Sequence, residues 1–378
     1  MSINLDNVTN ILLGNTPVEQ IADSQGNVLW SATPVVLPNY FYVEDASGSD
    51  NTLSIKQTYN FAPAIEVFKS TDGTNWTSMG TTTDIRAITA TIPANGKLYL
   101  KATTDAWASN NFTNRISVSG RYKVGGNIMS LLYGDNFQNQ TTFPSSSSTY
   151  RVFYQLFYNN TNLSDASGLV LPATTLTVYC YRSMFQGCTS LTTAPALPAT
   201  TMFSSCYDSM FSGCTSLTTA PALPATALAK DCYRMMFQNC TSLTTAPATL
   251  PATTLANNCY RMMFQNCTSL TTAPALPATT LADYCYGEMF RSCKSLTTAP
   301  ELPAPVLVNG CYSGMFKDCT NLTNLTTYAN DISASGCLSD WVSGVAAQGN
   351  FYNLGNPAPT YPSGASGIPS GWTEHTSL

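Results

Sequence analysis

Cysteine is the residue with the most chemical potential in this chain, and its spacing is regular. The 378 residues include 13 cysteines and a single histidine. Twelve cysteines form pairs eight residues apart, and the pairs begin at Cys180, Cys206, Cys232, Cys259, Cys285 and Cys311. On a helix, eight residues separate two Cα atoms by about 12 Å, whereas a disulfide requires them within roughly 7 Å. The spacing and the odd count therefore predict reduced, buried thiols that pack as small apolar groups.

The remaining reactive residues do not indicate metal binding or catalysis. No Cys-x-x-Cys motif occurs, and His375 is the only histidine, which makes a zinc site or a Ser-His-Asp arrangement a poor fit. We expect it to lie in a loose tail. Glycosidases need two carboxylates at a fixed separation. The acids of the repeats do not recur at equivalent positions: Asp208, Asp231, Asp283, Glu288 and Glu301. We therefore expect no catalytic residue and no cofactor, and a glycan-cleaving enzyme is the least favoured alternative.

The cysteines belong to a longer repeated phrase, Cys-Tyr-x-x-Met-Phe-x-x-Cys, which recurs every 26 residues. A second phrase, Thr-Ser-Leu-Thr-Thr-Ala-Pro-Ala-Leu-Pro-Ala-Thr-Thr, lies between the copies, as in residues 189–201. Thr249 adds one residue to a single copy, so that Cys232 and Cys259 are 27 apart. A fixed period of this length is typical of a solenoid, in which each unit buries its apolar face against its neighbours.

Each repeat is expected to hold one short helix and one short strand. Counting from the first cysteine as zero, positions 0, 1, 4, 5 and 8 share one helical face and hardly vary, whereas positions 2, 3, 6 and 7 vary. Leu191–Ala194 reads as the strand, which Pro195 ends because proline donates no ladder hydrogen bond. The predicted fold class is α+β, a leucine-rich-repeat solenoid of about seven 26-residue repeats.

The part of the chain before the repeats predicts an all-β domain. Alternating apolar residues and the turn signals Asp72-Gly73 and Asn95-Gly96 favour short strands joined in hairpins, as in an immunoglobulin- or fibronectin-like sandwich. Trp76 and Trp107 are candidate core residues, with carbohydrate binding as the alternative. Gly26-Asn27 predicts a turn between two strands of a smaller unit.

The predicted domain organisation follows these patterns along the chain. In order, it consists of an N-terminal attachment unit, a β-sandwich, an N-terminal cap, the solenoid and a C-terminal cap or tail that Trp372 anchors, over residues 1–33, 34–118, 119–150, 151–345 and 346–378. A degenerate first repeat follows the cap, with Leu156-Phe157 in place of Met-Phe and with Val152 and Asn160 at the two cysteine positions. The Gly125-Gly126 pair in the cap is interpreted as a turn.

Composition restricts the classes of partner. Only 10% of residues are charged and the net charge is −5, so no basic surface for nucleic acid is expected. No stretch is apolar enough to insert into a membrane, and no signal peptide is recognised. We therefore expect the protein to be synthesised in a cytoplasm.

The phrase Met-Phe-x-x-Cys-Thr-Ser-Leu-Thr-Thr-Ala-Pro resembles the BspA-like class of leucine-rich repeats, with Met in place of the usual Ala. The resemblance covers roughly residues 150–345. Three further phrases resemble repeat proteins of gut (Bacteroides-type) bacteriophages: Ile11-Leu-Leu-Gly-Asn-Thr-Pro-Val, Gly126-Asn-Ile-Met-Ser-Leu-Leu and Gly367-Ile-Pro-Ser-Gly-Trp.

These resemblances imply a non-enzymatic virion appendage, a tail or head fibre component that adheres to a host surface glycan or protein. Its partners would be other virion proteins, bound through residues 1–33, and the host receptor. A bacterial BspA-like surface adhesin is the alternative, with the bacterial cell surface as its location. A homo-oligomer is compatible with either, and no coiled-coil pattern fixes a copy number.

Candidate ligand-binding residues come from the variable, outward positions of the repeats. They are Tyr179, Arg234, Arg261, Tyr284 and Arg291. Recurring Arg and Tyr favour a stripe that faces a glycan, while the simpler interpretation is a solvated surface free to vary. The strand side is nearly identical in every repeat, with a monotonous Thr-Thr-Ala surface.

Overall fold

A computed structural model describes residues 39–57, 64–82, 86–102, 114–144 and 151–377, together with the backbone of four short strands before residue 32. The chain divides into two compact units, residues 1–39 and 40–378. In the first unit, β1 (Leu12–Leu13) pairs with β2 (Thr16–Pro17), and β3 (Gln20–Ala22) pairs with β4 (Val28–Ser31), both antiparallel. The predicted turn at Gly26-Asn27 lies outside the described residues, between the paired strands β3 and β4.

The second unit begins with two β-sheets. Their strands are β5 (Tyr42–Asp45), β6 (Asn51–Gln57), β7 (Ile65–Ser70), β8 (Thr77–Thr82), β9 (Ile88–Ile92), β10 (Lys97–Ala102), β11 (Asn114–Val118), β12 (Tyr122–Asn127) and β13 (Leu163–Val170). One sheet has the order β13-β12-β5-β10-β7-β8 and the other β11-β6-β9. In β6, Leu53 and Ile55 are buried while Lys56 is exposed, so the predicted alternation places one face of the strand in the core.

The two predicted hairpins have different outcomes. Asp72-Gly73 connects β7 and β8, which pair antiparallel, and Gly73 has a φ of 75°. Asn95-Gly96 does form a turn, but it connects β9 to β10, which belong to different sheets, so the hairpin prediction is wrong there. A turn signal fixes a local reversal and does not say whether the next strand pairs with the previous one.

Trp76 packs at the border of the core of this region. Its ring meets Tyr40 edge-on with centroids 4.6 Å apart, and the Lys101 ammonium lies 4.3 Å from its centroid. Trp76 is partly buried against the core, as the packing interpretation predicts. Trp107 lies outside the described residues.

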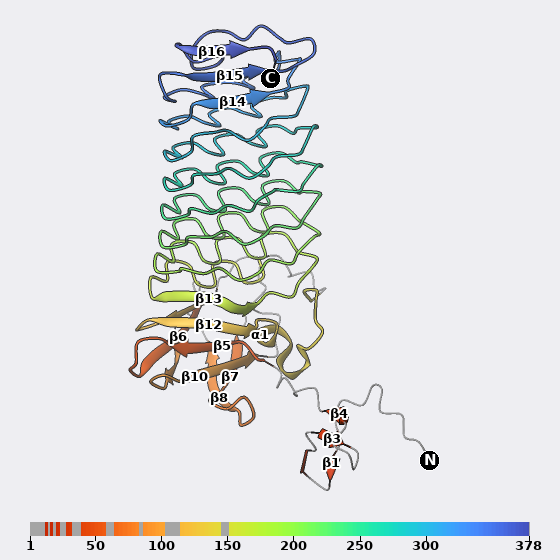
Figure 1. Cartoon of the computed structure of the whole chain (residues 1–378). Helices are drawn as coiled ribbons and strands as arrows, with labels where there is room; N and C mark the ends of the chain where they lie inside the picture. The colour runs from red at the N-terminus through yellow and green to blue at the C-terminus, as the bar shows by residue number, and fades with distance from the viewer. Residues whose placement is uncertain are drawn as a thin grey trace. The chain divides into compact units, whose positions relative to one another are not determined.

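The larger sheet continues directly into the repeats. β12 pairs antiparallel with β5 on one side and parallel with β13, from the first repeat, on the other (Figure 1). Gly125 and Gly126 are therefore strand residues, and their interpretation as a turn is wrong. A Cβ on Gly125 would lie 2.2 Å from the Tyr42 hydroxyl, so a larger residue there would have to displace the Tyr42 ring. The short helix α1 (Ser130–Tyr133) and the 3-10 turn η2 (Gly134–Asn136) follow β12.

The Cys-Tyr-x-x-Met-Phe-x-x-Cys phrase forms a chain of tight turns, and the prediction of a helix in each repeat is wrong. In the copy that starts at Cys180, every second N–H donates to the carbonyl three residues earlier, at 3.0–3.3 Å. The N–H groups between them donate to the next copy, for example Tyr181 to the Cys206 carbonyl at 2.9 Å and Ser183 to that of Asp208 at 2.9 Å. Half of the backbone donors thus join one repeat to the next.

Backbone conformation explains how these turns follow one another. Tyr179, Ser183 and Gly187 have φ values of 59°, 54° and 75°, and each is the third residue of a hydrogen-bonded four-residue turn. Positive φ at that place is the requirement of a type II turn. A non-glycine residue there is disfavoured by roughly 1–2 kcal/mol. Each of these three residues also donates its N–H to the next copy, so stacking of the repeats offsets the strain.

The inward positions are those that the repeat pattern predicts, although the geometry differs. Cys180, Tyr181, Met184, Phe185 and Cys188 are all fully buried. A chain of four-residue turns directs two neighbouring residues inward and the next two outward. That pattern selects the same positions 0, 1, 4, 5 and 8 as a helix, which is why sequence periodicity alone could not separate the two.

Aromatic rings stack along the core from one repeat to the next. The rings of Tyr207 and Tyr233 have centroids 5.8 Å apart and planes 3° apart, and those of Phe211 and Phe237 are 5.6 Å and 2° apart. The tyrosine column continues to Trp341, which stacks on Tyr312 at 6.4 Å. Each stacked pair contributes about 0.5–1.5 kcal/mol beyond its buried area, so the columns stabilise every junction between repeats.

The predicted strand of each repeat is reduced to single bridges. Thr245 bridges Thr219 on one side and Thr272 on the other, both in parallel. The proline that follows two residues later removes one donor, as expected for a strand that ends there. Longer strands occur only where the sequence leaves the consensus: β14 (Asn324–Thr327), β15 (Gly349–Asn353) and β16 (Trp372–His375) form a parallel sheet.

The C-terminal segment is held to the last repeats by both tryptophans. The Trp341 indole N–H donates to the Gly367 carbonyl at 2.8 Å, and that of Trp372 donates to Ala346 at 2.7 Å. His375 lies in β16, with its ring stacked on Tyr352 at 4.8 Å and Nε2 3.0 Å from Asn350 Oδ1. The expectation that His375 lies in a loose tail is therefore wrong.

Candidate ligand-binding face

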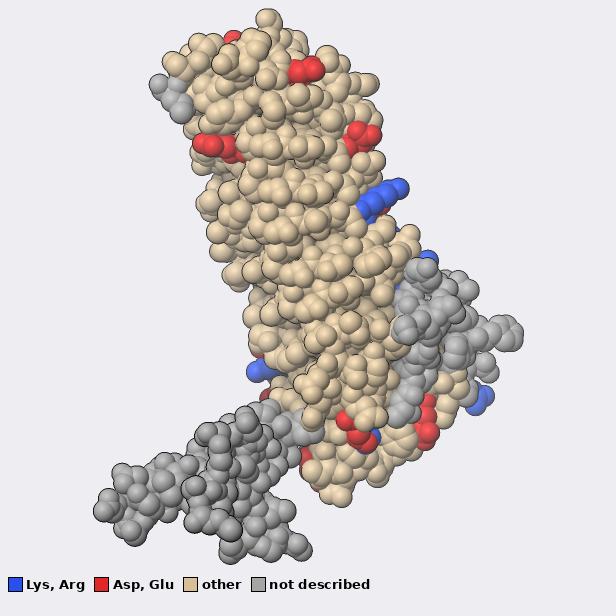
Figure 2. Space-filling view, turned by 90° about the vertical axis from the view of Figure 1, so that its right-hand side faces the viewer, with Lys and Arg blue, Asp and Glu red and all other residues tan. Residues whose placement is uncertain are grey.

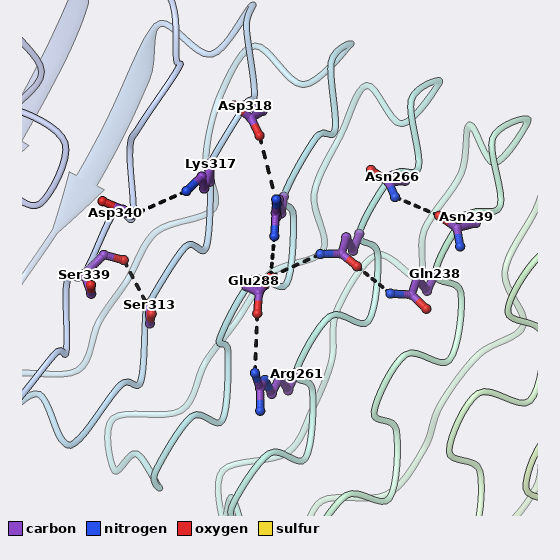
Figure 3. Close-up of polar contacts among 12 residues, drawn as sticks. Gln238, Asn239, Arg261, Asn266, Glu288, Ser313, Lys317, Asp318, Ser339 and Asp340 are labelled. Atoms are coloured by element: carbon purple, nitrogen blue, oxygen red, sulfur yellow. Dashed lines mark hydrogen bonds and ion pairs between the residues drawn. The ribbon is translucent and has the colours of Figure 1, made fainter.

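The outward positions of the turn chains form one continuous surface, which we call the turn face. It consists of the residues at positions −1, 2, 3, 6 and 7 of each copy, counted from the first cysteine. Because successive copies are joined by backbone hydrogen bonds in register, equivalent positions align into columns, as between Asn239 and Asn266, whose side chains bond at 2.7 Å. Figure 3 shows how these columns bring polar side chains of neighbouring repeats together.

Tyr179 and Arg234 lie at the two ends of a cluster that Arg182 and Asp208 connect. The Arg182 guanidinium lies 5.3 Å from the Tyr179 ring centroid, and its Nε is 3.2 Å from Asp208 Oδ2. Arg234 Nη1 approaches the same oxygen at 3.8 Å. Arg182 Nε is close to the carboxylate but is not aligned for a hydrogen bond, so the contact is an ion pair alone.

Asp208 is the buried centre of this cluster, with 2% of its side chain exposed. Burial raises the pKa of its carboxyl, against the lowering effect of the Ser209 hydroxyl, 2.7 Å away, and of the two arginines. The buried carboxylate attracts both guanidinium groups and restrains their positions, and it keeps one cationic partner when the other is removed. Arg182 and Arg234 remain 34% and 30% exposed, so their outer edges face solvent.

Arg261, Tyr284 and Arg291 are brought together around Glu288. Arg261 Nη2 lies 3.4 Å from Glu288 Oε1, and Arg291 Nη1 lies 2.8 Å from Oε2 of the same carboxylate (Figure 3). The Arg261 guanidinium is also 5.6 Å from the centroid of Tyr284, whose ring is 38% exposed. Gln265 donates to Glu288 Oε2 at 3.2 Å, so the carboxylate joins two neighbouring repeats.

A polar hollow of about 230 Å³ follows on the same face. Its lining includes Glu288, Arg291, Ser313, Lys317 and Asp340. Lys317 pairs with Asp340 at 3.0 Å, and Arg291 approaches Asp318 at 3.9 Å. The hollow therefore presents donors and acceptors side by side, which suits a hydroxyl-rich or zwitterionic surface better than a strongly charged one.

Sequence reasoning found the arginines and tyrosines but missed the carboxylates between them. Asp208 and Glu288 occupy adjacent turn positions, 2 and 3, of copies separated by two others. Because the two carboxylates occupy different positions in their copies, they were not predicted to form a catalytic pair. For the same reason, their role in holding the guanidinium groups was not predicted. The signal that was available is an outward arginine on each side. Asp208 lies 26 residues from both Arg182 and Arg234, and Glu288 lies 27 residues after Arg261 and three before Arg291.

The chain has few charged side chains, and many of those within the repeats lie on the turn face. The face displayed in Figure 2 is almost entirely uncharged, with isolated acidic and basic side chains. Within the described ranges, no group of three His, Cys, Asp or Glu side chains is arranged to hold a metal ion. No helix in those ranges has the length and apolar character needed to cross a bilayer.

The family model that describes BspA-type leucine-rich repeat regions matches six copies in this chain, over residues 132–271 and 236–337. The two matches together cover more than half of the 378 residues. The chain belongs to the BspA-type leucine-rich repeat family. No curated protein and no solved structure matches it. The BspA-type match includes every Met-Phe copy from Met184 to Met315, so the turn face belongs to the family's repeat region.

Proposed function

We propose that this BspA-type repeat protein is a non-enzymatic adhesion protein, and that its turn face is the surface that binds a host glycan or surface protein. One observation carries the proposal. The inward side chains are nearly invariant from copy to copy, whereas the turn face presents Arg, Tyr, Gln, Asn and Glu in fixed, mutually bonded positions. A rigid array of polar and aromatic groups is what recognition of an extended ligand requires.

The test of this surface is a binding assay with host cells and their isolated surface glycans. Arg261→Ala combined with Tyr284→Ala removes one of the two arginines that pair with Glu288 and the tyrosine that packs on it. We expect this variant to lose binding while keeping the melting temperature within a few degrees. Arg121→Ala, an exposed arginine in the β-sheet region, is the matched control. Retained binding by the double variant would exclude the turn face.

We further propose that the protein is a bacteriophage virion appendage, a leucine-rich-repeat solenoid of about seven repeats carried on an immunoglobulin-like domain. The separate unit of residues 1–39 supports an attachment role, and the phrases similar to gut-phage repeat proteins support the virion context. Residues 1–33 would then contact other virion proteins, and residues 151–345 would contact the host. The bacterial BspA-like adhesin is the second candidate, which the family membership supports equally well.

Deletion of residues 1–32 separates the two candidates. In the appendage model, particles of the deletion mutant lose this protein while the remaining fragment stays folded. Wild-type particles that never contain the protein, or a truncated form that still assembles, would overturn the virion proposal. Detection on the surface of bacteria without particles would then favour the adhesin.

A further inference from the structure

A second feature, made of residues that the proposed function does not use, lies where the smaller β-sheet meets the first repeat. A pocket of about 370 Å³ lies there, lined by Ser54, Lys56, Arg115, Ser117, Tyr158 and Asn159 among others. The volume falls in the range of about 300–1,000 Å³ that is usual for small-molecule sites. We call it the corner pocket.

The corner pocket contains two cations that face each other across a strand pair. Arg115 of β11 is the direct register partner of Lys56 of β6, and both point away from the buried face of the sheet. Like charges directly opposite one another destabilise a sheet. Neither cation forms an ion pair with any residue in the described ranges. Among the described residues, the lining has no carboxylate, although the chain as a whole is acidic.

Arg115 is held in place with donors to spare. Its Nη2 donates to Gln155 Oε1 at 2.7 Å, and its guanidinium lies 4.6 Å from the Tyr158 ring centroid. Its Nε is buried and has no acceptor among the described residues. Because that nitrogen is buried, a ligand would bind the terminal Nη atoms, which have further N–H donors besides the one that bonds Gln155.

The two walls of the corner pocket are fixed to each other by hydrogen bonds. The Ile116 N–H donates to the Leu156 carbonyl at 2.8 Å, and the Asn160 amide donates back to the Ile116 carbonyl at 2.9 Å. With the Arg115–Gln155 bond, these contacts join β11 to the first repeat. The pocket is thus formed before any ligand arrives, which reduces the ordering cost of binding.

We propose that the corner pocket binds a small carboxylated sugar, such as a uronate. The planar guanidinium group matches a carboxylate in two-point contact, and the Lys56 ammonium adds a second charge. Ser54 and Ser117, also register partners, offer hydroxyls on the same face for sugar hydroxyl groups. A single inorganic anion would leave most of the 370 Å³ unfilled.

Calorimetric titration of the full chain with glucuronate, glucose and inorganic phosphate at low salt tests the proposal. We expect saturable glucuronate binding with a Kd on the order of 1 mM, and weaker or undetectable binding of glucose and phosphate. Lys56→Met should weaken glucuronate binding by about tenfold or more, the loss of one charge-assisted contact. Lys123→Met, at an exposed lysine of β12 outside the pocket, is the matched control and should bind as wild type.

Thermal stability provides a readout that a purely structural role of Lys56 would not reproduce. Lys56→Met relieves a like-charge pair, so its melting temperature without ligand should equal or exceed that of wild type. Glucuronate should raise the melting temperature of wild type and of Lys123→Met, but not of Lys56→Met. Equal affinity for glucose, stronger binding of phosphate, no binding at all, or full binding by Lys56→Met would each overturn the proposal.

Discussion

The Sγ atom of Cys240 donates a hydrogen bond to the carbonyl oxygen of Phe211, 3.1 Å away in the preceding repeat. In each of the remaining five pairs, the second cysteine makes the equivalent bond, at 2.9–3.1 Å, to the phenylalanine carbonyl of the previous copy. The first cysteine of a pair lies in a different environment, and Cys232 donates to no acceptor among the described residues. The two cysteines of a repeat are therefore not equivalent.

Serine substitution should distinguish these two cysteine positions. Cys240→Ser keeps a donor opposite the Phe211 carbonyl, whereas Cys232→Ser buries a hydroxyl without an acceptor. An unpaired buried hydroxyl costs about 1–3 kcal/mol, so Cys232→Ser should lower the melting temperature more than Cys240→Ser. Thermal unfolding followed by circular dichroism measures both. The reverse order would show that the thiol–carbonyl contact does not stabilise the stack.

Met236 and Met235 are adjacent residues, one fully buried and the other partly exposed, which allows a matched test of the core. Met236 is fully buried, while Met235 lies on the turn face with a φ of 54°. Met236→Asp buries a carboxylate and should unfold the repeats, since such changes cost several kcal/mol. Met235→Asp should be tolerated, because Asp adopts positive φ more readily than Met. Equal melting temperatures of the two variants would contradict the assignment of inward and outward positions.

Arg234→Ala should change stability little, by about 1 kcal/mol or less, as for other partly exposed ion pairs. Asp208 keeps its nearer partner Arg182 at 3.2 Å and the hydroxyl of Ser209 at 2.7 Å. The same thermal unfolding measurement applies. A loss as large as that of Met236→Asp would mean that the Asp208 cluster, and not the core, dominates the stability of these repeats.

Thiol accessibility provides a direct count of the buried cysteines. All 13 are free in the structure, 12 of them fully buried and Cys337 3% exposed. Titration with a thiol reagent should therefore find 13 thiols after denaturation and almost none in the folded protein. Cys337 should be modified first, which mass spectrometry of the labelled peptides would identify. Recovery of several disulfides from the purified protein would contradict the prediction.

Stability should fall in alkaline solution. Burial raises the pKa of the Cys206, Cys240 and Cys259 thiols to about 12, from a usual 9.0, and raises the pKa of the stacked tyrosines well above 10.0. Because these pKa values are higher in the folded state, the stability they contribute is fully present below pH 9 and is lost as the pH rises toward about 12. The melting temperature should decline steeply in that window, and the six stacked tyrosines should add their phenolate absorbance only with unfolding. Ionisation of all 20 tyrosines while the protein is still folded would contradict the burial of the tyrosine column.

The repeat period, its inward residues and the predicted β-rich segment before it could be read from the sequence, because burial selects residue types strongly. The local conformation could not, because the same inward positions fit a helix and a chain of turns. One signal for turns was present at position 7, where the copies have Gly187, Gly213, Asn239, Asn266, Ser292 and Asp318. These residue types favour turns and positive φ, whereas a helix has no need of them at a regular interval.

The candidate site could likewise be predicted from the sequence only in part. Outward arginines and tyrosines are visible as variable positions, but their partners depend on which residues of neighbouring copies align. Glu288 reaches Arg261 across a repeat junction and Arg291 within its own copy. Arg115 and Lys56 lie 59 positions apart, and only strand register places them opposite each other. Local pattern cannot supply such register.

The stacked rings make each junction between central repeats nearly interchangeable. Each central repeat contacts the next one through a tyrosine, a phenylalanine and a row of backbone carbonyls. The previous repeat presents the same groups to it, with ring spacings of 5.7–5.8 Å along the central tyrosines. A copy gained or lost through recombination between identical phrases would therefore leave both new junctions intact. The length of the repeat array could therefore change during evolution by whole repeats, while the first and last segments of the array stay unchanged.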